Sequence, residues 1–260
     1  MSVSKPENPL RIVRHAPRYI RLPIFLAHRP AAAAGRATHG PAWIARCVLI
    51  GLGLALVPAV KAATPLPVAI ESHHAINDLS PPGRAPAHTL TLHAANIGDW
   101  DDAKLVAGLR EAAAIFAQCR IRIVRAELLR VTVPATHRDF DTPRSRELAR
   151  ALALPKPALF FAAGTRQVPA FDAEAIGRGN SRTRPELRDT VWIARGARDL
   201  GPVIAHELAH VLMDSGAHDN TPGNLMAEET SPQHTLLSAA QCARITATGV
   251  RHGLLQPGVD

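Results

Sequence analysis

The feature that most constrains this chain is the stretch VIAHELAHVLMDSGAH, residues 203–218. His206 and His210 lie four residues apart, so a helix stacks both imidazoles on one face, where they can hold one metal ion. Glu207 lies about 100° further round the helix and can reach a water at the metal without being a ligand. The alternative is a structural helix with two surface histidines, but its apolar neighbours favour burial, where an unpaired glutamate is costly. These neighbours are Val203, Ile204, Leu208, Val211 and Leu212.

A catalytic zinc site usually has three protein ligands and one open position. We expect His218 to be the third ligand, because Gly216 can end the helix in a left-handed conformation and turn the chain back. Asp214 and Asp219 are competing oxygen ligands. Asp219 can instead hold a ligand histidine by a hydrogen bond.

The net charge of +8 belongs to the first part of the chain. Residues 1–62 hold nine Lys or Arg side chains and one acid, Glu7, whereas residues 63–260 hold 21 basic and 21 acidic side chains. The body of the chain therefore carries no basic excess, which argues against a nucleic-acid partner.

Residues 1–62 are typical of a basic leader that ends in a signal peptide. Eleven apolar residues at 47–57 follow a short basic flank, and VKA at 60–62 fits a signal-peptidase site. This run is shorter than the ~18–20 residues that span a bilayer, so we expect no stable membrane span after cleavage and a periplasmic or secreted protein. An uncleaved anchor is the alternative. Residues 1–42 are consistent with a translation start that is assigned too far upstream, which we favour, or with an organellar transit segment.

Cysteine usage agrees with export. Cys119 and Cys242 remain once Cys47 leaves with the leader. An even pair in an oxidising compartment predicts one disulfide. Two separately buried thiols are the alternative.

The body of the chain predicts one α+β domain over residues 88–260. The Pro-rich residues 63–87 show no periodicity, so we expect a linker or a surface arm there. A capping box from Ser238 to Gln241 opens the last helix. We expect its buried side to hold Ala240, Ala243, Ile245 and Val250. Hydrophobic periodicity predicts strands at 88–97, 120–133, 157–164, 173–180 and 189–195, and helices at 99–119, 141–154 and 200–214.

Residues 203–226 resemble the metzincin zinc peptidases, which carry HExxH on a helix, a glycine turn, a third His and a tight turn with Met below the metal. His206, Glu207 and His210 match the helix, His218 matches the third ligand, and Met226 in NLM resembles the Met-turn. The resemblance implies a zincin-like catalytic domain, in which a small twisted mixed sheet accompanies a motif helix and a C-terminal helix. In such a domain the helices that carry Cys119 and Cys242 pack together below the site.

The spacing of the glycine and the third histidine departs from the family pattern. The family pattern HExxHxxGxxH places its Gly at Met213 and its third His at Gly216, so here the helix end must be two residues longer or looped out.

In the family, substrate pairs as an extra strand with an exposed sheet edge above the zinc, and residues 173–179 are our candidate for that edge. A solvated loop is the alternative. The candidate edge residues are Ile176, Gly177 and Arg178.

The sequence thus predicts an exported zinc-dependent peptidase, an endopeptidase, that hydrolyses peptide bonds with a metal-activated water and Glu207 as general base. Zn²⁺ is expected on His206, His210 and His218. The expected partner is a peptide or protein substrate, and the expected oligomeric state is a monomer. The alternative is a non-catalytic zinc-binding relative that binds peptides or the cell envelope, although a structural zinc would not need Glu207.

Overall fold

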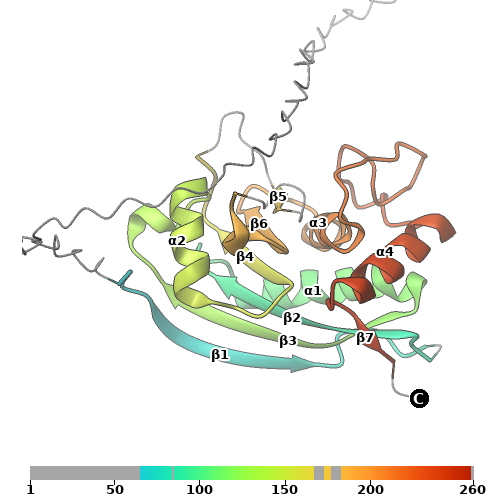
Figure 1. The fold of residues 1–260 in the computed structure, drawn as a ribbon, viewed down its shortest axis with the longest axis horizontal. Helices are drawn as coiled ribbons and strands as arrows, with labels where there is room; N and C mark the ends of the chain where they lie inside the picture. The colour runs from blue at the N-terminus through green and yellow to red at the C-terminus, as the bar shows by residue number, and fades with distance from the viewer. Residues whose placement is uncertain (1–64, 84, 167–172, 177–182, 259–260) are drawn as a thin grey trace, which may run out of the picture. The chain divides into compact units, whose positions relative to one another are not determined.

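The computed structural model describes residues 65–83, 85–166, 173–176 and 183–258 (Figure 1). The leader and signal peptide predicted over residues 1–62 lie outside this part of the chain, as do Gly177 and Arg178. Within it, no helix has the length and apolar character needed to cross a membrane.

The described strands form one mixed sheet in the order β1-β3-β2-β4-β6-β5, with β7 paired to β2. The four central strands run parallel to one another, whereas β1 and β5 lie antiparallel at the two edges. The α+β prediction with a mixed sheet is therefore confirmed. The strands are β1 (Ala69–Asn77), β2 (His88–Asn96), β3 (Ile121–Thr132), β4 (Ala158–Ala162), β5 (Ala173–Ile176), β6 (Thr190–Ala194) and β7 (Gln256–Pro257).

Helices cover both faces of the sheet and bury two separate apolar cores. Alternate residues of β4 enter different cores: Leu159 and Phe161 face α1 and α3, whereas Phe160 faces α2 on the other side. This alternation is what a fully buried strand requires. The predicted helices are all present, as α1 (Asp102–Phe116), α2 (Thr142–Leu152), α3 (Leu200–Met213) and α4 (Ala239–Arg251).

The structure differs from the predicted linker or arm at residues 69–77, which form the edge strand β1. This strand pairs with β3 through its main chain, and only Ser72 and Ile76 along it are even half-buried. An edge strand held mainly by backbone hydrogen bonds needs no regular apolar alternation, so the sequence pattern did not reveal it.

The buried side of α4 was also predicted wrongly. Ile245 is buried as expected, but Ala240, Ala243 and Val250 are exposed. The helix packs instead through Gly249, where a Cβ atom would lie 2.8 Å from Leu255 Cγ. A missing side chain lets two elements approach closely, and a search for apolar residues overlooks it.

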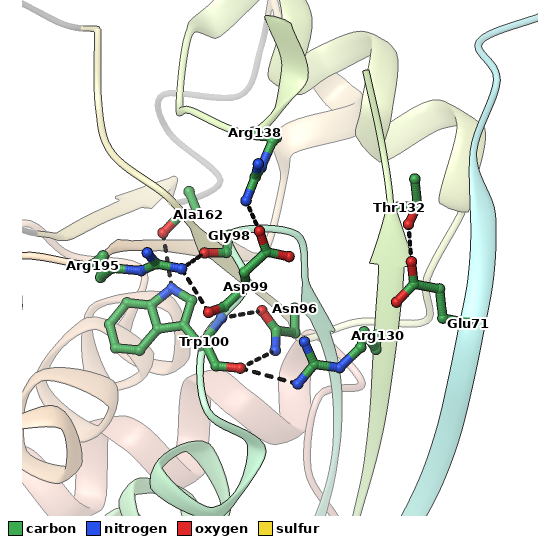
Figure 2. A network of polar contacts seen from close by, with 10 residues as sticks. All are labelled: Glu71, Asn96, Gly98, Asp99, Trp100, Arg130, Thr132, Arg138, Ala162 and Arg195. Atoms are coloured by element: carbon green, nitrogen blue, oxygen red, sulfur yellow. Dashed lines mark hydrogen bonds and ion pairs between the residues drawn. The ribbon is translucent and has the colours of Figure 1, made fainter. Parts of the chain in front are cut away.

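A polar network fixes the connections that lead into α1 and α3 (Figure 2). Arg195, just after β6, donates to the main-chain oxygens of Gly98 and Asp99, just after β2. Trp100 Nε1 donates to the Ala162 oxygen at 2.9 Å, at the end of β4. The connection from β6 to α3 is thereby tied to the connection from β2 to α1, which in turn is tied to the carboxyl end of β4.

Asn96 is the buried centre of this network, and we expect Asn96→Ala to lower the free energy of unfolding by about 2–4 kcal/mol. Its Nδ2 donates to Trp100 O at 2.8 Å and to Asp102 Oδ1 at 3.0 Å, and its Oδ1 accepts from Trp100 N–H at 3.0 Å. Urea denaturation measures the loss. The exposed Asn77→Ala is the control, expected within about 0.5 kcal/mol of wild type; equal effects of both variants would contradict the network's importance.

Cys119 and Cys242 form a disulfide that joins the end of the first helical segment to the first turn of α4 across 123 residues. We expect replacement of both cysteines by alanine to cost about 2–5 kcal/mol of unfolding free energy, because the bond restricts the unfolded chain. Chemical denaturation of the oxidised wild type, the reduced wild type and the double variant measures this cost. Three coincident denaturation midpoints would refute it.

Lys156 gives folding a specific alkaline pH dependence. Burial lowers the pKa of its ammonium group to about 8, although the negative charge of Asp189 opposes the shift. Between pH 8 and the unfolded-state pKa of about 10.4, the unfolded chain keeps this proton while the folded chain has lost it. The free energy of unfolding therefore rises with pH across this range. Lys156→Met should flatten this rise in a pH series of denaturation curves, whereas Lys104→Met should retain it.

Candidate metal centre

The helix α3 carries His206 and His210 into the protein rather than onto its surface. His206 is 3% exposed and His210 is 8% exposed, while Glu207 between them is only half-buried. Apolar neighbours on the same helix, including Leu208 and Val211, are fully buried in the core below α1 and α4. The expectation of a mostly buried motif helix is confirmed.

Main-chain oxygens orient both imidazoles. His206 Nδ1 donates to the Leu225 oxygen at 2.8 Å, and His210 Nδ1 donates to the Ser215 oxygen at 2.7 Å. Because a carbonyl oxygen only accepts, each ring carries its proton on Nδ1 and leaves an Nε2 lone pair. The two Nε2 atoms face one another at 2.9 Å.

His218, beyond the end of α3, completes this group. Its ring centre lies 5.4 Å from that of His206 and 5.0 Å from that of His210. The three rings each offer one nitrogen, and these nitrogens lie within 4.8 Å of one another. The structure therefore brings together all three histidines that the sequence analysis selected.

The donor set fits a divalent cation such as Zn²⁺. Two nitrogens bound to one tetrahedral zinc at 2.0–2.1 Å lie about 3.3 Å apart, close to the separation of the two Nε2 atoms. Facing lone pairs repel one another unless a cation lies between them. Three neutral imidazoles are also ligands that zinc commonly takes in proteins.

The acid-base state of the two buried histidines agrees with this fit. Burial lowers the pKa of His206, with the hydrogen bond to Leu225 opposing the shift. Burial, together with the charge of His206, lowers the pKa of His210 to about 4. Both rings are therefore neutral at pH 7, and a metal ligand must be neutral imidazole.

The turn that brings His218 back differs from the predicted one. The left-handed residue is Asp214, with φ 49° and ψ 51°, and the left-handed conformation predicted for Gly216 is not found. Aspartate tolerates this conformation better than most residues. The helix runs through Met213, where the family pattern has its glycine, and the extra chain length lies between Asp214 and His218.

The two aspartates considered as ligands have other places in the structure. Asp214 caps α3. Asp219 Oδ1 accepts from Thr221 Oγ1 at 2.7 Å, and Asp219 Oδ2 accepts from Gln241 Nε2 at 3.4 Å. His206 and His210 donate instead to the Leu225 and Ser215 carbonyl oxygens. Sequence reasoning missed these acceptors, since no side-chain pattern marks a main-chain acceptor.

Met226 lies in a turn, directly after Leu225, whose carbonyl oxygen accepts from His206. It is 1% exposed and belongs to the same core as α3. Its N–H donates to Asn224 Oδ1 at 2.8 Å, and its carbonyl oxygen accepts from Asp219 N–H at 2.8 Å. The turn thus closes on itself and presents the Leu225 oxygen to His206.

The candidate substrate edge falls partly within the structure. Ile176 ends β5, the last strand of the sheet order, which pairs antiparallel with β6 and with no other strand in the described part of the chain. β5 also contacts the motif helix α3. An edge strand beside the motif helix is therefore present, and Gly177 and Arg178 lie beyond the part of the chain described.

Comparison with known proteins finds solved structures of similar fold. No family model and no curated protein matches this sequence. A solved structure, the crystal structure of metalloproteinase-II from Bacteroides fragilis, aligns with a TM-score of 0.48 and 16% identity over 65% of this chain. The chain spans about half the length of that protein, with 55% of it covered.

Proposed function

We propose that this chain is a zinc-dependent peptidase of the metzincin type, with His206, His210 and His218 as ligands and Glu207 as general base. The observation that carries the proposal is the pair of buried Nε2 atoms facing each other at 2.9 Å beside a third imidazole. A helix with a purely structural role gains nothing from holding two nitrogen lone pairs this close, because they repel one another. Glu207, between the two helical histidines, adds a base that a purely structural metal would not need.

The chain's own residues divide the reaction between them. His206, His210 and His218 would hold the zinc, which would supply the Lewis-acid part of the chemistry on a carbonyl oxygen and on water. The Glu207 carboxylate takes a proton from the attacking water and passes it to the nitrogen of the leaving amine. The Leu225 and Ser215 carbonyl oxygens hold the rings of His206 and His210 in a fixed orientation during this proton transfer.

Substrate binding is proposed at the edge of β5 with which no described strand pairs. An extended peptide can add to an exposed edge strand through main-chain hydrogen bonds, which select for backbone rather than for sequence. The edge position of β5 and its contact with α3 support this placement, with Ile176 and the following Gly177 and Arg178 as candidate contacts. A substrate so bound is an unstructured peptide or protein segment.

Export and proteolytic maturation are part of the same proposal. The disulfide between Cys119 and Cys242 supports an oxidising compartment, and residues 1–62 have the pattern of a cleaved leader. We propose a periplasmic or secreted monomer without a nucleic-acid partner.

Elemental analysis of the purified protein, combined with a casein or peptide turnover assay, tests the proposal. We expect one zinc per chain and turnover that a strong chelator removes and added zinc restores. Protein without stoichiometric metal would refute the metal site. Zinc-loaded protein without turnover on a broad peptide library would favour the non-catalytic binding protein.

A further inference from the structure

Gln241 connects the first turn of α4 to the turn that orients His206. Its Oε1 accepts from Ser238 N–H at 2.8 Å and from Asn224 Nδ2 at 3.1 Å. Its Nε2 donates to Asn224 Oδ1 at 2.9 Å and to Asp219 Oδ2 at 3.4 Å. One side chain thus completes the capping box of α4 and contacts both Asp219 and Asn224 of the 219–226 turn.

Asn224 carries this connection to the metal site. It is 5% exposed, and its Oδ1 also accepts from Met226 N–H at 2.8 Å. Asn224 and Met226 flank Leu225, whose carbonyl oxygen accepts the Nδ1 proton of His206 at 2.8 Å. Hydrogen bonds from Gln241 to Asn224, the main chain of residues 224–226 and the hydrogen bond from His206 to Leu225 therefore connect Gln241 to His206.

The far end of this series is anchored to the body of the protein. The neighbouring residue Cys242 is covalently joined to Cys119, which follows α1 in the chain. The Ser238 side chain accepts from Gln241 N–H at 3.2 Å, which fixes the first turn of α4. The disulfide and the Ser238 hydrogen bond therefore fix the position of Gln241, so that its amide group can hold the 219–226 turn in place.

We propose that Gln241 is a positioning residue for the metal site, acting through Asn224 and the Leu225 carbonyl on the tautomer and direction of His206. The ring keeps its Nε2 lone pair for the metal only while Nδ1 holds the proton, and the Leu225 oxygen stabilises that tautomer. The metal part of this inference rests on the proposed function. The tautomer part concerns the metal-free protein as well.

Two substitutions separate positioning from helix capping. Gln241→Glu keeps oxygen acceptors for Ser238 N–H and Asn224 Nδ2, but it removes the donor to Asn224 Oδ1 and places a carboxylate against that of Asp219. Ser238→Ala removes the hydroxyl acceptor of the capping box and leaves the Gln241–Asn224 pair intact.

Zinc affinity, measured by competition with a chelating indicator, and the side-chain ¹⁵N signals of His206 in the metal-free protein form the test. We expect Gln241→Glu to bind zinc about 10–100-fold more weakly than wild type and to lose the pure Nδ1–H signature. Ser238→Ala should lower the Tm by about 2–4 °C but keep the affinity within about threefold and keep the signature.

Each outcome bears on the inference. A wild-type signature and unchanged affinity in Gln241→Glu would overturn the positioning role, and equal losses in both variants would reduce it to helix stability. If wild-type protein bound no zinc while Gln241→Glu still changed the His206 tautomer, the orienting role would stand and the proposed function would fall.

Discussion

Glu207→Gln is expected to lower kcat/KM for peptide hydrolysis by about 10²–10⁴-fold, the usual contribution of a positioned general base. Glutamine has nearly the shape of glutamate but cannot take a proton from water. Glu207 is half-buried on α3 between His206 and His210, so the substitution leaves the ligand set in place. Zinc content and fold should therefore stay those of the wild type while turnover is lost.

The matched control is Glu147→Gln, the same chemical change on α2, across the sheet from the site. Glu147 is exposed over about half of its side chain and contacts His137. Its turnover should equal that of the wild type. Turnover that is retained in Glu207→Gln at the wild-type level, with zinc present, would remove the general-base assignment and favour a binding protein.

His218→Ala is expected to have the largest effect on metal binding, since it removes a ligand rather than a partner that orients one. Loss of an orienting partner usually weakens binding about 10–100-fold, and loss of a direct ligand should exceed this range. Zinc that binds only the folded protein also stabilises the folded state. Added zinc should therefore raise the Tm of the wild type and leave that of His218→Ala almost unchanged.

Asp214→Asn and Asp219→Asn serve as controls for the competing oxygen ligands. Asparagine tolerates the left-handed conformation of residue 214 and keeps hydrogen-bonding capacity at residue 219. Both variants should keep zinc affinity within about tenfold of wild type. A greater loss in Asp219→Asn than in His218→Ala would make the carboxylate the third ligand.

The sequence predicted the elements that bury a periodic apolar face. In α1, Leu105, Leu109, Ala113 and Phe116 recur every three or four residues, and all four are fully buried. The capping box at Ser238 and Gln241 was readable because its two residues lie three apart in the chain. Local periods and local spacings can be read from one sequence because neighbours in the chain are neighbours in space.

What the sequence did not reveal depends on contacts between distant residues. Arg195 meets Gly98 and Asp99 only after β2 and β6 have taken their places around β4. The pairing of Gln241 with Asn224 likewise requires the fold, since 17 residues separate them. The left-handed turn was assigned to Gly216 on glycine's freedom alone, whereas the actual helix length placed it at Asp214.

The two faces of the sheet each carry one tryptophan. Trp100 lies in the core that packs under α1, α3 and α4, and Trp192 stacks on Phe160 in the core under α2, with ring centres 4.0 Å apart. Trp43 is the third tryptophan, and Tyr19 is the single tyrosine. Phenylalanine replacements that leave one indole at a time thus turn intrinsic fluorescence into a separate optical reporter for each layer, one of them on the histidine side of the molecule.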